Sequence, residues 1–213
     1  MKRIALVVCS VGCVSSYQSA RVLPTGKTQV TVAVSRVQAL EDGDEDESVW
    51  VGDLQVRHGF AAQFDGGIRL SRTPGGLNSL SMLTIDPKYQ ITSPSSSTAV
   101  SIGVPFGVAW EEQGSDFEDG IGVIAPTLLI GTPLAASTEL VFAPKVVVFL
   151  PDGDTEESEI EFGASIGLRF TNSARTWAIH PELSLLLFDP SNGSEGGETA
   201  KILSFGVAVS AGN

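Results

Sequence analysis

Apolar and polar residues alternate along most of the chain after Thr28. The longest run covers residues 160–170, where apolar side chains from Ile160 to Phe170 alternate with Glu, Gly, Ser and Arg. Residues 30–35 and 177–185 repeat the pattern. Successive side chains of a β-strand point to opposite faces, so this alternation predicts strands with one apolar and one polar face.

Ten strands are expected from this pattern. Most are longer than the about 5–6 residues of an ordinary strand, and they match the roughly 9–11 residues that a tilted strand needs to cross a membrane. The predicted ranges are 28–40, 49–60, 64–72, 78–91, 98–111, 119–131, 138–150, 158–170, 176–188 and 201–211.

The connections between these strands form two classes that alternate along the chain. The acidic class comprises 41–48, 111–120, 151–157 and 189–200, with the uncharged 73–77 joining it by position. The short class, without acids, comprises 61–63, 92–97, 132–137 and 171–175. In a meander, alternate connections lie at opposite ends, and long loops opposite short turns are typical of membrane barrels. The sequence therefore predicts an all-β, closed antiparallel up-and-down transmembrane β-barrel of about ten strands, with both chain ends on the short-turn side.

The charge of the chain is strongly negative and unevenly placed. The formal net charge is −12, and 19 of the 25 acids lie in or beside the four acidic loops. This balance disfavours nucleic acid, because phosphate binding needs clustered Lys and Arg. The acidic loops are candidate binders of divalent cations, although 42–46 lacks the Gly and Glu of an EF-hand loop. A solvated, repulsive surface is the alternative.

The remaining charged residues of the strands lie at the alternate positions that point to the polar face. Because charges sealed inside a narrow barrel must pair, they predict an ion-pair network in the lumen rather than an open channel. The alternative is the solvated face of a soluble sheet. The predicted network comprises Asp53, Arg57, Asp65, Arg69, Asp86, Lys88, Glu139, Lys145, Glu161, Arg169, His180 and Glu182.

Three bases have the opposite parity and lie at the acidic-loop ends of their strands. Arg36, Arg72 and Lys201 would face outward there. They are candidate contacts for lipopolysaccharide phosphates, with Arg36 and Lys201 expected on adjacent strands of the closed barrel. The alternative is that they are ordinary rim residues whose charged ends reach water.

The N-terminus has the features of an export signal. Lys2 and Arg3 precede an apolar stretch from Ile4 to Val14, which is too short to span a bilayer as a helix. Gly12 before Cys13 resembles a lipobox, although Ser10 stands where Leu is usual, so Cys13 is the predicted acylation site. The alternative is that Cys9 and Cys13 both lie in a cleaved segment. The expected organisation is a lipoprotein-type signal peptide at 1–13, a Ser-rich tether at 14–27 and a barrel at 28–213.

Catalytic and metal-binding patterns are not found. The two histidines, His58 and His180, have no partner at a metal-ligand spacing, and neither is placed at the outer rim, where a barrel protease would need His with Asp. No enzyme activity, cofactor or metal is therefore expected.

Prolines within the predicted strands are unusual, and bulges in one layer near the short turns would accommodate them. They are Pro87, Pro105, Pro126, Pro144 and Pro181.

Residues 57–72 (RHGFAAQFDGGIRLSR) and 85–91 (IDPKYQI) carry a family resemblance. They are similar to the strand–turn–strand segments of small bacterial outer-membrane β-barrel proteins. The resemblance implies a Gram-negative outer-membrane location with membrane lipid as a partner, and no particular activity. The last strand lacks the terminal aromatic residue common in such proteins.

Three functions stay open: a structural or surface-interaction barrel, a narrow pore-like barrel for small ligands, and a soluble periplasmic β-sandwich lipoprotein.

Overall fold

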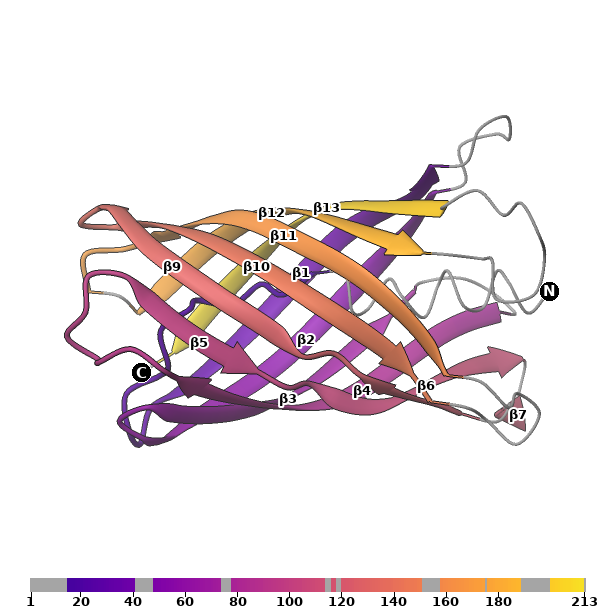
Figure 1. Ribbon diagram of the computed structural model, residues 1–213, viewed down its shortest axis with the longest axis horizontal. Coiled ribbons are helices and arrows are strands. Elements are labelled where there is room, and N and C mark those ends of the chain that lie inside the picture. Colours follow the sequence, from indigo (N-terminus) through magenta and orange to yellow (C-terminus); the bar gives the residue numbers. More distant parts are fainter. Residues whose placement is uncertain are drawn as a thin grey trace.

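The computed structural model describes residues 15–40, 48–73, 78–113, 116–117, 120–150, 158–174, 176–188 and 200–212. These residues form a single antiparallel sheet that closes on itself (Figure 1). None of them belongs to a helix long enough and apolar enough to cross a membrane. The strands are β1 (Thr28–Leu40), β2 (Ser48–Ala61), β3 (Phe64–Arg72), β4 (Asn78–Gln90), β5 (Ala99–Gly103), β6 (Phe106–Gln113), β7 (Asp116–Phe117), β8 (Ile121–Ile124), β9 (Thr127–Ala135), β10 (Thr138–Phe149), β11 (Glu159–Thr171), β12 (Trp177–Phe188) and β13 (Ala200–Gly212).

Sequential neighbours pair around the whole ring. β5 and β6 both pair with β4, and β8 and β9 both pair with β10, so each couple is one interrupted barrel strand. The ring closes where β1 pairs with β13, with Val32 opposite Val209. The predicted closed antiparallel barrel of ten strands is thereby confirmed. The soluble β-sandwich is wrong, because one continuous ring of paired strands leaves no second sheet to stack on it.

Proline explains the two interruptions. Pro105 lies in the gap between β5 and β6, and Pro126 in the gap between β8 and β9. Neither can donate to the ladder, but their carbonyl groups still accept, from Ala125 N at 2.8 Å and Val146 N at 3.0 Å. Pro87, on the neighbouring β4, accepts in the same way from Val104 N at 3.0 Å. Three proline carbonyls therefore join four adjacent barrel strands at one level, where the ladder is broken.

The two faces of the wall differ as the alternation predicts. Large apolar side chains on the outside are exposed, among them Val32 at 57%, Ile68 at 58% and Ile166 at 48%. Their neighbours in sequence, such as Thr31, Arg69 and Ser165, are buried in the lumen. An apolar outside around a polar inside is the reverse of a soluble protein, and it is the arrangement of a barrel surrounded by hydrocarbon.

Candidate functional site

The lumen gathers the charged residues that share the polar parity. Ten of the twelve are buried, and Glu139 and Arg169 are half-buried. Arg57 binds Asp65 and, at 2.5 Å, Asp86. Lys88 Nζ lies 3.4 Å from the same Asp65. One arginine and one lysine thus meet two carboxylates in the half of the lumen next to the short turns.

Two further groups of charges lie further from the short turns, towards the middle of the lumen. Arg69 binds Asp53 through Nη2 at 2.7 Å and Nε at 2.9 Å. Nε2 of His180 lies 3.8 Å from the Glu182 carboxylate on the same strand. Glu161, Lys145 and Arg169 have interaction partners as well. Buried charges held in this way avoid most of the cost of leaving water unpaired.

Residues 15–23, here called the lumen strap, occupy the centre of the barrel. Ser15, Ser16, Tyr17, Gln18 and Ala20 are all buried, although this segment precedes β1. The strap begins beside Ser204 and Arg69, and it descends to the short turns, where the Leu23 amide binds Asp65. It therefore runs antiparallel to β1 and fills the lumen that β1 helps to enclose.

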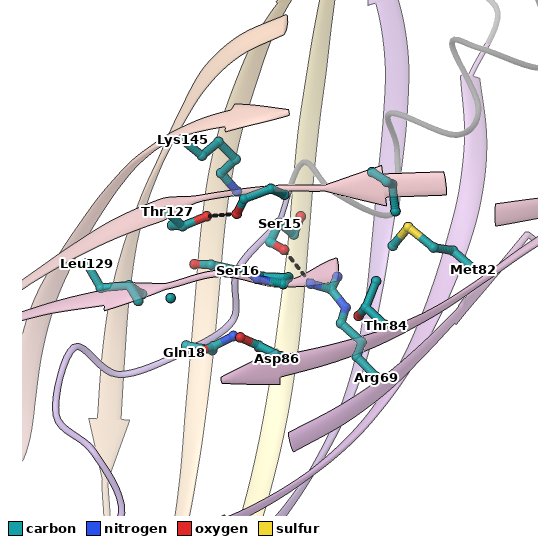
Figure 2. Close-up of a pocket in the computed structure, with 14 residues that line it drawn as sticks. Ser15, Ser16, Gln18, Arg69, Met82, Thr84, Asp86, Thr127, Leu129 and Lys145 are labelled. Carbon is teal, nitrogen blue, oxygen red and sulfur yellow. Dashed lines mark hydrogen bonds between the residues drawn. The ribbon is translucent and has the colours of Figure 1, made fainter. Parts of the chain in front are cut away.

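The lumen charges bind the polar groups of the strap. Glu182 accepts the amides of Ser16 at 2.6 Å and Tyr17 at 2.9 Å. Lys88 donates to the carbonyls of Ser19 at 2.9 Å and Arg21 at 3.0 Å. Side chains add contacts, since Ser19 Oγ donates to Glu139 and Gln18 donates to Asp86. Arg69 donates to the Ser15 carbonyl (Figure 2). An extended buried segment has no ladder of its own, so these charged side chains satisfy its backbone.

The wall is also shaped to admit the strap. A Cβ atom added to Gly206 would collide with the Tyr17 hydroxyl, and one added to Gly131 would lie 2.7 Å from the Cβ of Ala20. Tyr17 itself adopts a φ of 45°, in the left-handed region that non-glycine residues rarely occupy. This conformation directs two consecutive amides at Glu182, the arrangement of a backbone anion nest. The strap and the wall are thus mutually fitted.

The half of the lumen next to the acidic loops has a different lining. Many of its inward-facing residues are apolar and form one buried cluster, here called the outer cluster, although the buried Glu161 lies opposite Val147 of this cluster. Its larger members are Val37, Val51, Leu80, Met82, Val123, Val147, Phe149, Leu186 and Ile202. The sequence pattern did not predict it, because these residues occupy the face expected to be polar. The signal was present as apolar residues on both faces near the loop ends, for example Val147–Phe149.

Open space within the lumen is small and unevenly distributed. A cavity of about 30 Å³ lies between the strap and the wall, bordered by Ser15, Gln18, Asp86 and Lys145 (Figure 2). That volume suffices for one or two water molecules. A much larger vestibule, about 1060 Å³, opens at the short-turn end around Arg21, Lys27 and Arg169.

The strap replaces part of an expected tether. Residues 14–27 were expected to be a Ser-rich tether on the short-turn side, whereas residues 15–23 lie inside the barrel. Sequence pattern gave no sign of this, since nothing in a short Ser-rich run distinguishes a linker from a buried strap. The predicted signal peptide with Cys13 and most of the acidic-loop residues lie outside the described residues. Within the described part, no group of His, Cys, Asp and Glu could hold a metal ion.

The histidines lie where the parity predicts. His58 is half-exposed on the outer face near a short turn, where Thr28 Oγ1 lies 2.9 Å from its Nδ1. His180 is 2% exposed in the middle of the lumen. Neither is at the acidic-loop rim, so the described residues do not form a His–Asp catalytic pair there.

The chain matches no protein-family model and no curated protein sequence. Solved structures do match it. The translocator domain of the autotransporter NalP from Neisseria meningitidis has a TM-score of 0.52 at 12% identity, over 99% of this chain and 93% of that one. The outer membrane protease OmpT from Escherichia coli has 0.44 at 8% identity, over 91% and 98%. The outer membrane protein OprG from Pseudomonas aeruginosa has 0.38 at 12% identity, over 92% and 99%. The similarity to the NalP domain is one of fold, that of a β-barrel.

Replacing Arg57 with methionine tests the buried charge group. The change leaves Asp65 and Asp86 buried with less compensation, and breaking such a pair costs about 3–5 kcal/mol. The midpoint of urea unfolding in lipid vesicles should fall accordingly. The matched control, Arg36→Met, removes an exposed arginine and should shift stability by no more than about 0.5 kcal/mol. Equal effects of the two substitutions would contradict the pairing.

A disulfide trap tests the position of the strap. The hydroxyl groups of Ser15 and Ser204 are 3.4 Å apart, so a Ser15→Cys, Ser204→Cys variant should cross-link on mild oxidation. Cys9 and Cys13 are replaced with serine in this background. The control pair, Ser15→Cys with Ser101→Cys, should remain reduced, because Ser101 binds the strap five residues further along, at Ala20. A linker outside the barrel would give no Ser15–Ser204 cross-link.

Proposed function

We propose that the chain is an outer-membrane barrel with a closed lumen, and that it has a structural or surface-interaction role. The observation that carries the proposal is the lumen strap, bound by the charged residues that would otherwise line a channel. The outer cluster adds a second barrier in series. A barrel whose lumen is filled by both the strap and the outer cluster is suited to presenting its loops rather than to passing solutes.

The surface of the barrel supports the proposed outer-membrane location. Its outward face is apolar over the middle of the wall, with exposed aromatic residues towards both ends. Phe60, Phe64 and Tyr89 lie near the short turns, and Trp50 and Phe205 lie nearer the acidic loops. Apolar bands between aromatic girdles are the pattern of outer-membrane barrels. The acidic loops would then face outward, where divalent cations or cationic surfaces are partners of matching charge.

Arg36, Arg72 and Lys201 support a further proposal about lipid contacts. All three are exposed on the outer face near the acidic-loop end. Arg36 and Arg72 lie on either side of β2, opposite Trp50 and Gly52. Lys201 is opposite Leu40, four residues beyond Arg36, so it is less close to Arg36 than the sequence suggested. We propose that the two arginines contact lipopolysaccharide phosphates, for which Arg is well suited.

Single-channel recording separates the closed barrel from the pore. The intact protein in a planar bilayer should give no reproducible conductance steps, while a porin in the same lipid serves as the positive control. Boiled and unboiled samples should migrate differently on a denaturing gel, which shows that the tested protein is folded. Reproducible steps from folded protein would establish the narrow pore instead.

Replacing Arg36 and Arg72 together tests the lipid contact. An Arg36→Gln, Arg72→Gln variant should co-purify with several-fold less lipopolysaccharide than the unaltered protein, as measured by phosphate analysis after mild detergent extraction. A Lys27→Gln variant, altered at the short-turn end, should retain the normal amount. Unchanged lipid in the double variant would show that the arginines are ordinary rim residues.

A further inference from the structure

The wall of the lumen binds the strap mainly through the backbone of the strap. Residues 15–23 belong to no strand, yet eight of their backbone groups form hydrogen bonds with side chains of the wall. Carbonyl groups of the strap accept these bonds from Arg69, Lys88 and Ser101, and amide groups donate them to Glu182, Gln90 and Asp65. Every residue except proline presents the same two backbone groups. Contacts of this kind can therefore hold an extended peptide of a different sequence.

Two side chains of the strap lie in fitted positions that add selectivity. The Tyr17 ring packs with Ala33 and Ala208, which face each other on the paired strands β1 and β13. Ala20 is 0% exposed, and a Cβ atom added to Gly131 would lie 2.7 Å from the Cβ of Ala20. The first position therefore suits a flat ring against small side chains, and the second admits nothing larger than alanine.

The end of the strap at the short turns provides a place for an arginine. The Arg21 guanidinium donates to three carbonyl groups of the 92–97 turn, those of Pro94 at 3.2 Å, Ser96 at 2.7 Å and Ser97 at 2.8 Å. A guanidinium group has five N–H donors and can serve several acceptors at once. The vestibule of about 1060 Å³ begins beside these residues and extends to Thr28. It is as large as the pockets of small-molecule ligands, which are about 300–1,000 Å³, so a peptide can approach from the short-turn side.

The strap is not the best occupant that this site could hold. Tyr17 has a φ of 45°, which strains a residue with a Cβ atom. Gln18 Oε1 and Asp86 Oδ1 are buried without a hydrogen-bond partner among the described residues, and both side chains border the cavity of about 30 Å³. Backbone strain and unpaired buried acceptors both weaken binding. A peptide that avoids these costs would bind more tightly than the strap does.

We propose that the short-turn half of the lumen is a binding site for an extended peptide, and that the strap occupies this site until a second peptide displaces it. The ligand would be a segment of small polar residues that carries an aromatic residue, a small residue three positions later, and then arginine. The covalent link to β1 gives the strap an effective concentration on the order of millimolar, which keeps weaker peptides out. This site goes beyond the proposed closed barrel, since it depends on the strap contacts and not on conductance or on the outer loops.

Cutting the link between the strap and β1 tests the proposal. A protease recognition sequence is inserted in the full chain between Thr25 and Gly26, which are both exposed, and the folded barrel is cut in detergent. A peptide of residues 15–27 with a fluorophore on Lys27 is added in excess, and its anisotropy is measured. The cut barrel should bind the peptide saturably, and the uncut barrel about tenfold or more weakly, because its tethered strap competes. Heat-modifiable migration before and after cutting shows that the barrel stays folded.

Two altered peptides separate binding in the lumen from adsorption to the protein or the detergent. The Ala20→Leu peptide has the same length and charge, but it has no room beside Gly131 and should not bind. The Ser19→Thr peptide keeps its hydroxyl group and should bind normally. Failure of the folded, cut barrel to bind the unaltered peptide would contradict the proposal, whether the cut strap leaves or stays in place. Equal binding of the unaltered and Ala20→Leu peptides, or equal binding by the cut and uncut barrels, would contradict it as well.

A wall variant tests the backbone contacts directly. Glutamine in a Glu182→Gln variant has one acceptor oxygen, so it cannot accept from both the Ser16 and the Tyr17 amides, and the cut barrel should bind the peptide about tenfold or more weakly. The matched control, Glu159→Gln, lies at the acidic-loop end of β11 and should bind normally. If the Glu182→Gln variant does not fold, a Tyr17→Ser peptide makes the test on the unaltered wall, where loss of the ring should weaken binding several-fold. Unchanged affinity would show that the site does not recognise the peptide as the strap is recognised.

Discussion

The structure depends on one constraint: polar groups enclosed in a narrow lumen must find partners there. A ten-stranded barrel is only slightly wider than an eight-stranded one, whose interior side chains fill it. Charges lining such a lumen have little water and must be paired. Here, they are paired partly with each other, as in Arg57 with Asp65 and Asp86, and partly with the backbone of the strap. The ion pairs and the strap are therefore one arrangement, and removing either leaves the other unsatisfied.

The two halves of the lumen meet this constraint in different ways. The half near the short turns is charged and contains the strap, whereas the half near the acidic loops is lined largely by the apolar side chains of the outer cluster. The first solution gives specificity, because four carboxylates bind particular amide or hydroxyl groups of the strap: Asp65, Asp86, Glu139 and Glu182. The second lowers the number of polar groups that need partners. Together they fill much of the lumen, which is the basis of the proposed closed barrel.

Sequence alone predicts most of the strands of the barrel wall, but little of what occupies the lumen. Strict alternation in 160–170 or 30–35 determines both strand type and facing, so strand ranges and the closed ring follow from local pattern. Prolines 105 and 126 indicate irregular ladders, and the structure has gaps there. The strap is different, because its position depends on wall partners 42 to 189 residues away, from Asp65 to Ser204. Gly206 and Gly131 are informative only after the strap is known to lie beside them. The outer cluster was not predicted, because alternation reveals an inward face only where that face is polar. Near the acidic loops, apolar residues occupy both faces of the strands.

The central claim is that the apolar face of every strand contacts hydrocarbon while the opposite face is sealed inside the barrel. Spin labels placed singly at residues 30 to 34 of β1, with the protein in lipid vesicles, measure this directly through collisions with oxygen and with a water-soluble nickel complex. Labels at Val30, Val32 and Val34 should collide readily with oxygen and rarely with nickel, and labels at Thr31 and Ala33 should be shielded from both. High nickel accessibility at Val32, or the loss of the two-residue period, would contradict the account.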